Sequence, residues 1–465
     1  MFKASDYLGL LHQLEQFFAD AQSEPLEPAE LEQQLSLELP AVGTSLEHLH
    51  AEISNYLSYA VKTAHPTYFN QLWGGFNAAG FMGEILTSAT NTSMYTYEVA
   101  PAATLIENAL IAKMGSFVGF SEPEGQFTTG GSNGNLMAVA IATHKALPSA
   151  KQIGMLGAPP LIAFVSAEAH YSFVKAAQLL GLGARQVWKV PVDENGAMIV
   201  TELEALIAKA HAQGAQPFFV VGTAGTTVRG VFDPFTEIAA VAQRENLWFH
   251  IDGSWGGGVL LSASHRHLMA GAELADSVVW DAHKMMGLSL VCSVLLVKHR
   301  GLMQDTFTAS DTEYLFHAGD EDPVDLGLST MHCGRRVDAV KLWLAWKHLG
   351  DRGWEALIDR YFELAAYAES IIDAHPSLRL VTPRVSLNLC FQYIPKEPQQ
   401  CANDLTLRIR AALLEQRIAM VNYAELDGST VFRLVICNNQ TSSEDLETFF
   451  EALVATAQTL EQEAV

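Results

Sequence analysis

The chain has 465 residues, 49% of them hydrophobic, and its 28 Lys and Arg residues against 52 Asp and Glu residues give a formal net charge of −24. A surface this acidic repels phosphate backbones and anionic lipids, which argues against nucleic acid and membrane partners but leaves an anionic substrate possible. We find no signal-peptide pattern and no apolar run long enough to cross a bilayer, so we expect a cytoplasmic protein.

Three segments follow one another along the chain. Residues 1–64 show helical periodicity interrupted by Pro25, Pro28 and Pro40, which predicts a helical arm. Residues 65–341 alternate helix-length and strand-like stretches, which predicts a large α/β domain with a mostly parallel central sheet. Residues 342–465 start with a long helical stretch and continue with strand-like pieces near 387–393 and 431–436 and a terminal helix, which predicts a smaller α+β domain.

The β-rich runs of the large domain set the places where functional side chains are expected. In parallel sheets, ligands bind at the carboxyl ends of the strands, so the loops that follow these runs are the candidates. The expected strands are residues 160–166, 217–222, 247–251, 277–280 and 292–298. The five cysteines have scattered spacings and no C-x-x-C pair, which favours reduced core thiols over a disulfide framework or a metal site.

A glycine-rich turn, Thr128-Thr129-Gly130-Gly131-Ser132-Asn133-Gly134-Asn135, precedes the helical pattern of residues 136–147. Free backbone N–H groups and the positive end of the helix dipole suit a phosphate group there. The same letters match G-x-S-x-G, the nucleophile elbow of α/β-hydrolases, with Ser132 as the nucleophile. A plain turn is the third interpretation, and the motif alone does not decide between them.

Two charged residues stand at strand ends. Asp252 closes the apolar run 247–251, where a carboxylate must either cap the following turn or bind a cationic ligand atom. Lys284 follows the run 277–280, where the alternatives are a snorkelling lysine and an amine that forms a Schiff base. His170 lies a few residues after the first run, where a lone histidine is more often structural than catalytic.

The order of these features is more informative than any one of them. A phosphate turn, a histidine, the sequence Gly225-Thr226-Thr227, a strand-end aspartate and a strand-end lysine follow successive strands. With these residues in place, the chain resembles the group II pyridoxal-phosphate decarboxylases, especially the glutamate, cysteine sulfinate and aspartate 1-decarboxylases. The resemblance is carried by residues 65–72, 95–101, 223–230, 232–234, 255–258, 283–287, 333–335, 337–338 and 432–438.

The resemblance implies an aspartate-aminotransferase-like fold and roles for the residues at the strand ends. Lys284 would hold pyridoxal 5'-phosphate as a Schiff base, Asp252 would keep a proton on the pyridine nitrogen, and His170 would stack on the ring. Thr227 would hydrogen-bond near the ring substituents, and Ser254 would place a hydroxyl against the ring face. The remaining cofactor-binding residues implied are Gly131, Ser132, Asn133 and His283.

The resemblance also implies a proton donor and a substrate pocket. Tyr314 matches the mobile-loop acid of relatives, which would act across the interface of a homodimer. Arg433 matches the arginine that grips the acidic side chain of the substrate, with Gln71 and Leu72 on the other wall. Trp73 stands where glutamate decarboxylases have a small residue and cysteine sulfinate and aspartate decarboxylases an aromatic one. We therefore expect a short acidic amino acid as the substrate.

The chain departs from the family pattern at two positions. The family usually has Asn-Pro-His-Lys where this chain has Asp281-Ala282-His283-Lys284, and Gly253 and Ser254 replace two alanines after Asp252. An aspartate at position 281 would repel the phosphate unless it is turned away or bridged. The alternatives to a decarboxylase are an aminotransferase of the same fold, a serine hydrolase that uses Ser132, and a non-catalytic relative, which would be expected to have lost Lys284 or Asp252.

Overall fold

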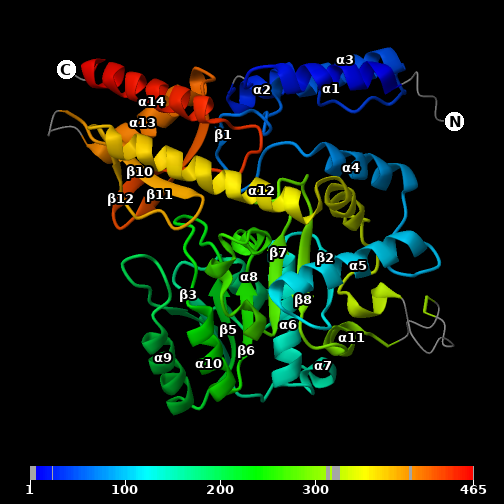
Figure 1. The fold of residues 1–465 in the computed structure, drawn as a ribbon. Helices are drawn as coiled ribbons and strands as arrows, with labels where there is room; N and C mark the ends of the chain where they lie inside the picture. Colours follow the sequence, from blue (N-terminus) through cyan, green and yellow to red (C-terminus); the bar gives the residue numbers. More distant parts are fainter. Residues whose placement is uncertain (1–6, 24, 311–314, 317–324, 397–400, 464–465) are drawn as a thin grey trace. The chain divides into compact units, whose positions relative to one another are not determined.

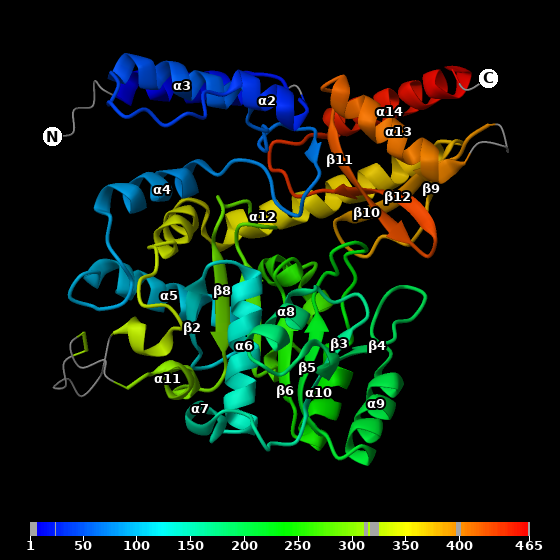
Figure 2. The ribbon, with the colours of Figure 1, turned by 180° about the vertical axis from the view of Figure 1, so that it is seen from behind.

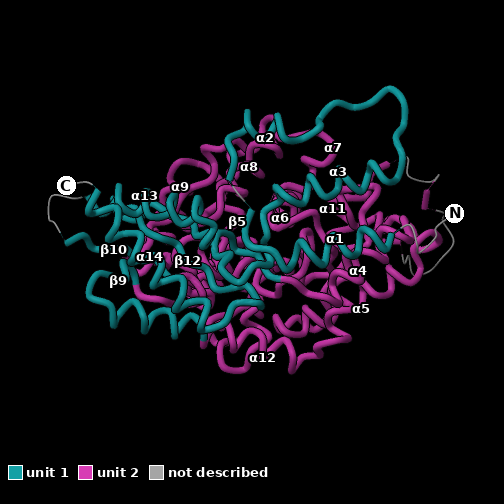
Figure 3. Tube along the Cα trace, turned by 90° about the horizontal axis from the view of Figure 1, so that it is seen from above, with its two compact units in different colours: residues 1–75, 364–382, 389–465 teal, residues 76–363, 383–388 magenta. Residues whose placement is uncertain are grey.

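The computed structural model describes residues 7–23, 25–310, 315–316, 325–396 and 401–463. These residues form two compact units, coloured separately in Figure 3. We call residues 76–363 and 383–388 the larger unit, and residues 1–75, 364–382 and 389–465 the smaller unit. The predicted boundaries after residues 64 and 341 stay predictions.

The larger unit is built on a seven-stranded sheet in the order β2-β8-β7-β6-β5-β3-β4, seen in Figure 1. Strands β7, β6, β5, β3 and β4 are parallel, whereas β8 is antiparallel to both of its neighbours. This arrangement confirms the predicted mostly parallel sheet. The strands are β2 (Glu124–Thr128), β3 (Leu161–Ser166), β4 (Val187–Val190), β5 (Gln216–Thr223), β6 (Trp248–Asp252), β7 (Ser277–Asp281) and β8 (Ser293–Val297).

Helices cover both faces of this sheet. Side chains of successive strand residues point to opposite faces. On β5, Phe219 and Val221 pack in the core that includes Met137 of α6, whereas Gly222 faces Phe235 of α10. Figure 2 shows α6 in front of the sheet with α8 beside it. The helices of the larger unit are α4 (Ala78–Thr90), α5 (Pro101–Val118), α6 (Gly131–Ala146), α7 (Ala150–Ile153), α8 (Ser172–Leu179), α9 (Val200–Ala212), α10 (Phe235–Glu245) and α11 (Leu302–Phe307). Helix α12 (Ala339–Ala374), interrupted at Gly350, belongs to the larger unit up to Glu363 and to the smaller unit from Leu364 on.

The smaller unit contains a five-stranded sheet in the order β1-β11-β12-β10-β9. The ladder between β11 and β12 is antiparallel and pairs Asn422 with Arg433, whereas the short β1 joins β11 in parallel. Its strands are β1 (Tyr68–Phe69), β9 (Leu378–Leu380), β10 (Asn388–Tyr393), β11 (Met420–Leu426) and β12 (Ser429–Val435). Its helices are α1 (Leu8–Ala19), α2 (Pro28–Gln34), α3 (Leu46–Tyr59), α13 (Ala402–Glu415) and α14 (Ser443–Glu463).

Pro28 lies at a helix start, and three of the five cysteines are buried. Pro28 begins α2, where its missing N–H leaves no donor unsatisfied. Cys292, Cys390 and Cys437 are buried as expected, whereas Cys333 and Cys401 are exposed, so the prediction of core thiols is wrong for these two. In the described part of the chain, no helix is long and apolar enough to cross a membrane.

Candidate active site

Strand direction brings the predicted cofactor residues to one edge of the larger unit's sheet. The parallel strands β3, β5, β6 and β7 all end there, and β2 ends there as well because it is antiparallel to β8, which is antiparallel to β7. His170, Thr227, Asp252 and Lys284 follow or close these strands, and the turn at Gly131 follows β2. The edge is the one that the carboxyl-end rule predicts.

Asp252, the last residue of β6, is a buried carboxylate with satisfied oxygens. Its Oδ2 accepts a hydrogen bond from Asn135 Nδ2 at 2.9 Å, and its Oδ1 accepts one from the backbone N–H of Ser254 at 3.1 Å. Burial raises the pKa of Asp252, but the charge of Lys284 and the hydrogen bonds from Ser254 and Asn135 outweigh it, so the pKa lies below its ordinary value. Asp252 therefore stays anionic inside the protein, and it also caps the following turn.

A chain of buried polar groups supports this carboxylate. His250 Nε2 lies 3.0 Å from Asn135 Oδ1, and His250 Nδ1 lies 2.8 Å from Ser277 Oγ, which also accepts from Trp248 Nε1. Burial lowers the pKa of His250 to about 4, so the ring is neutral near pH 7. Because Asn135 Oδ1 can only accept, the ring proton is assigned to Nε2, which donates to Asn135, and Nδ1 accepts from the Ser277 hydroxyl.

Asn135 and His250 were missed as functional residues from the sequence. Asn135 Nδ2 also donates to Ser172 Oγ at 3.0 Å, so its amide joins α6, α8 and the end of β6. A histidine within an apolar strand is a usable signal for such a network, since a buried polar ring requires partners. Position 135 lies one helical turn after Gly131, and its side chain faces the sheet, where it meets Asp252.

Lys284 lies three residues beyond the end of β7 and is partly exposed, with 22% of its side chain accessible. Its Nζ is 3.1 Å from Oδ2 of the buried Asp281. The other oxygen of Asp281 accepts from Ser293 Oγ at 2.5 Å, and His283 Nε2 is 3.7 Å from Oδ2. Asp281 is thus held by Lys284 and Ser293 on its two oxygens.

His170 lies in the loop between β3 and α8. Its Nδ1 accepts from the N–H of Ser172 at 3.3 Å, and its ring lies against Tyr171 with centroids 4.2 Å apart. Burial lowers the pKa of His170 despite the opposing charges of Asp252 and Asp281. The ring is thus neutral near pH 7 and electrostatically coupled to both carboxylates.

The glycine turn forms the start of α6. Gly130 has a φ of +122°, which favours glycine, and its carbonyl accepts from Asn133 and Gly134. A Cβ on Gly131 would collide with Ser254 Oγ and come within 2.8 Å of Asp281 Oδ2, so only glycine allows this approach. The first N–H groups of the helix have no partner within it and can bind an anion.

Three further residues, Ser132, Asn133 and Thr227, complete the cofactor side. Ser132 is exposed and Asn133 is half-buried. Thr227 follows β5, and its carbonyl accepts from Asn388 Nδ2 at 3.2 Å, so its loop is anchored.

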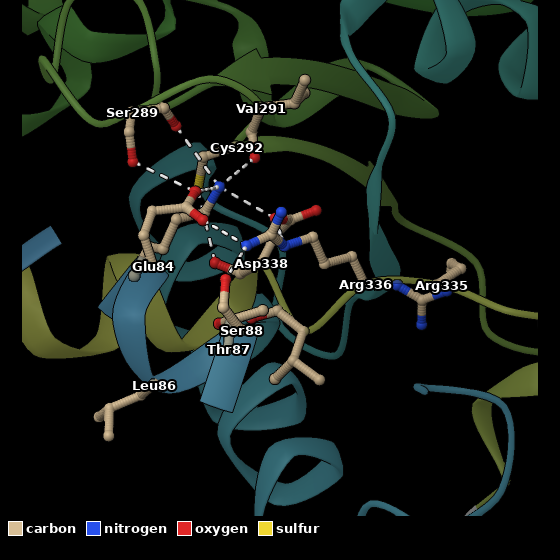
Figure 4. A network of polar contacts seen from close by, with 12 residues as sticks. Glu84, Leu86, Thr87, Ser88, Ser289, Val291, Cys292, Arg335, Arg336 and Asp338 are labelled. Carbon is tan, nitrogen blue, oxygen red and sulfur yellow. Dashed lines mark hydrogen bonds and ion pairs between the residues drawn. The ribbon is translucent and has the colours of Figure 1, made fainter. Parts of the chain in front are cut away.

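A buried lysine anchors the segment that follows Lys284. The side chain of Lys341 is fully buried, and its Nζ contacts Glu84 Oε1 at 2.6 Å and Asp338 Oδ1 at 2.9 Å. It also donates to the carbonyl of Val291 at 2.6 Å and to that of Ser289 at 3.5 Å. Figure 4 shows this network, with Glu84 and Asp338 directed toward the segment.

The same segment returns to the active-site lysine through His283. The N–H of Cys292 lies 3.1 Å from His283 Nδ1, next in sequence to Lys284. Burial lowers the pKa of His283, and its Nδ1 also lies 3.0 Å from the carbonyl oxygen of Cys292, so the tautomer decides which backbone group of Cys292 pairs with it. Lys341 therefore stabilises the segment 289–292, which in turn holds the residue before Lys284.

The predicted substrate residues belong to the smaller unit, where they lie together. Arg433 on β12 is buried, and its Nη2 donates to the carbonyl of Asn70 at 2.8 Å. Burial lowers the pKa of Arg433. Cys437 Sγ contacts the carbonyl of Gln71 at 3.8 Å, Leu72 is buried, and the ring of Trp73 lies 5.8 Å from that of Tyr68. Tyr314, the predicted proton donor, lies outside the described residues.

The residues of the larger unit fit pyridoxal phosphate. The cofactor requires an anionic carboxylate for its ring nitrogen, an amine for its aldehyde and an anion site for its phosphate. Asp252 meets the first requirement, since it is buried and its pKa is lowered. Lys284 meets the second, with 22% of its side chain accessible, and the start of α6 meets the third.

Comparisons with known proteins agree with this chemistry. The model of the pyridoxal-dependent decarboxylase conserved domain matches residues 28–394. Human cysteine sulfinic acid decarboxylase is 39% identical over 447 residues, covering 93% of this chain and 90% of the relative. The acidic amino acid decarboxylase of Bos taurus is 38% identical over 432 residues, covering 90% and 83%. The crystal structure of mouse CSAD in its apo form has a TM-score of 0.93 at 35% identity and covers 98% of this chain and 99% of that one.

Proposed function

The chain belongs to the family of pyridoxal-dependent decarboxylases, and we propose that it removes the α-carboxylate of a short acidic L-amino acid, releasing carbon dioxide and the amine. Cysteine sulfinate and aspartate are favoured over glutamate. The observation that carries the proposal is the buried, anionic Asp252, coupled electrostatically to Lys284 at the ends of adjacent parallel strands. Bound pyridoxal 5'-phosphate supplies the electron sink that stabilises the carbanion left by carbon dioxide.

The larger unit supplies the groups that hold and tune the cofactor. In this proposal Lys284 Nζ bonds to the aldehyde carbon, and Asp252 keeps the proton on the ring nitrogen. His170, Thr227 and Ser254 would hold the ring, and His283 would support the lysine. Gly131, Ser132 and Asn133 bind the phosphate at the start of α6.

Substrate choice is assigned to the smaller unit. A guanidinium binds a carboxylate or sulfinate with two parallel hydrogen bonds, which suits Arg433 to the side chain of an acidic amino acid. The resemblance puts Gln71 and Leu72 on the other wall of this pocket, and the bulk of Trp73 would shorten it. The names of the relatives, cysteine sulfinic acid decarboxylase and acidic amino acid decarboxylase, support an acidic substrate.

The remaining parts of the proposal concern assembly and protonation. We assign protonation of the substrate's α-carbon to Tyr314, acting in the neighbouring active site of a cytoplasmic homodimer. A placed acid at that carbon favours the amine product over the keto acid of transamination.

The test measures carbon dioxide release from cysteine sulfinate, aspartate and glutamate by the cofactor-loaded enzyme, with keto acid formation recorded in parallel. The proposal predicts stoichiometric carbon dioxide and amine, with the highest kcat/KM for one of the two shorter substrates. A preference for glutamate would contradict the pocket-length argument. Keto acid as the main product would make the enzyme an aminotransferase instead.

A further inference from the structure

We propose that Asp281 is a positioning residue for Lys284, holding its amine as an ion pair whenever that amine is not bonded to the cofactor. This inference rests on the proposed role of Lys284 as the cofactor lysine. It concerns a residue that the cofactor-binding groups described above do not include. The pair joins Lys284 Nζ to Asp281 Oδ2 at 3.1 Å, with the aspartate side chain 1% exposed.

The position of the carboxylate is fixed by the sheet. Asp281 is the last residue of β7, and the antiparallel ladder pairs it directly with Ser293 on β8. Ser293 Oγ donates to Asp281 Oδ1 at 2.5 Å, and Thr128 Oγ1 of β2 lies 3.0 Å from Ser293 Oγ. Three neighbouring strands therefore hold this carboxylate, so it meets Lys284 from a rigid support.

The surroundings of Asp281 favour its negative charge. It borders Gly131, the first residue of α6, whose positive dipole end favours an anion. His283 is neutral because burial lowers its pKa, and its Nε2 is 3.7 Å from Asp281, farther than Lys284 Nζ. The cation that pairs with Asp281 is therefore Lys284.

The two carboxylates near Lys284 have different tasks. Asp252 accepts from Asn135 and the N–H of Ser254, and the proposed function commits it to the ring nitrogen. Asp281 is directed at the amine. Its charge holds Nζ beside the start of α6 before the cofactor binds, and receives Nζ again when the substrate's amino group takes its place.

The ion pair also opposes the formation of a bond between Lys284 Nζ and an aldehyde carbon. Nζ attacks the aldehyde carbon as a neutral amine, so the ammonium group must first give a proton to Asp281 or to water. The C=N bond then replaces the C=O bond, and the aldehyde oxygen leaves as water with the remaining amine protons. Asp281 therefore lowers the reactivity of the free amine of Lys284 and fixes the position of that amine.

The reactivity of the amine can be measured without the cofactor. The full-length apoenzyme is labelled with a trace of acetic anhydride at neutral pH, and mass spectrometry compares acetylation of Lys284 with that of the exposed Lys347. Asp281→Asn is expected to raise the labelling of Lys284 roughly three- to tenfold, the effect of losing a partly exposed ion pair. Asp276→Asn, a matched change just before the same strand, should leave it at the wild-type rate.

Acetylation of the buried Lys341 reports whether a variant has unfolded, and Asp281→Ser provides a second, smaller substitution with the same expected increase. Equal labelling of Lys284 in wild type and a folded Asp281 variant would overturn the inference. Pyridoxal phosphate followed by borohydride tests the proposed function separately. A wild type that takes no cofactor on Lys284 refutes that function, whereas cofactor uptake with unchanged acetylation refutes the role of Asp281 alone.

Discussion

Asn135 on α6 donates a hydrogen bond to Asp252 at the end of β6 over 2.9 Å, so the helix that starts at the glycine turn also fixes the buried carboxylate. The same amide accepts from the ring of His250. The anion site at the helix start and the carboxylate at the strand end are therefore parts of one rigid arrangement. A cofactor that bridges the two would find both ends already placed.

The first prediction concerns this bridge. Asn135→Ala removes one donor from Asp252 and leaves the ring N–H of His250 unpaired, which costs about 1–3 kcal/mol per buried group. We expect the Kd for pyridoxal phosphate to rise at least about tenfold, measured by absorbance titration of the apoenzyme. Thr143→Ala, later on the same helix, is the control, and equal affinities of the two variants would contradict the bridging role.

A pH effect follows from the neutral state of His250. Its pKa falls from 6.5 to about 4 on folding, so the group stabilises the protein fully above pH 6.5 and loses that contribution as pH falls toward 4. The loss amounts to about 3 kcal/mol. Urea unfolding of the apoenzyme across this range should show a shallower pH dependence in His250→Gln, and an unchanged slope would show that the histidine does not titrate in this way.

The strands that could be predicted from the sequence are the deeply buried ones. All five predicted strands of the larger unit are present, because each is a continuous apolar run buried on both faces. The expected aspartate-aminotransferase-like fold is confirmed by the solved relatives. Strands β1, β2, β4, β9 and β11 were missed, since the first four are edge strands and the outward residues of β11 are polar or exposed.

The candidate site likewise contains residues that the sequence indicates and partners that it does not. Asp252 and Lys284 could be proposed because they are charges at the ends of apolar runs. The partners of Asp252 could not, since the link from Asn135 spans 117 positions and depends on which side of α6 faces the sheet. The bridging of Asp281 by Ser293 depends on the register of β7 and β8, which local sequence does not specify.

The buried Lys341 gives the third prediction. Lys341→Met leaves Glu84 and Asp338 without their shared ammonium group and should lower the free energy of unfolding by about 3–5 kcal/mol. Lys347→Met changes an exposed lysine on the same helix and should stay within about 0.5 kcal/mol of wild type. Denaturant unfolding measures both variants, and equal free energies of unfolding would refute the anchoring role of Lys341.

The fourth prediction addresses substrate binding. Arg433→Met should lower kcat/KM for the acidic substrate roughly 100-fold, about 3 kcal/mol, because two charge-assisted hydrogen bonds are lost. The absorption of the bound cofactor should not change. Arg379→Met alters an exposed arginine of the smaller unit, on β9, and should retain wild-type kinetics. A variant at Arg433 with normal kcat/KM would remove this residue from the substrate site.

The most direct test of the account is to reduce the cofactor-loaded enzyme with borohydride and to map the modified peptide by mass spectrometry. With Lys284 as the cofactor lysine, we expect a yellow protein that loses its colour on reduction, with a single pyridoxyl group on Lys284. A colourless protein that cannot be loaded with pyridoxal phosphate, or a pyridoxyl group on another lysine, would contradict it.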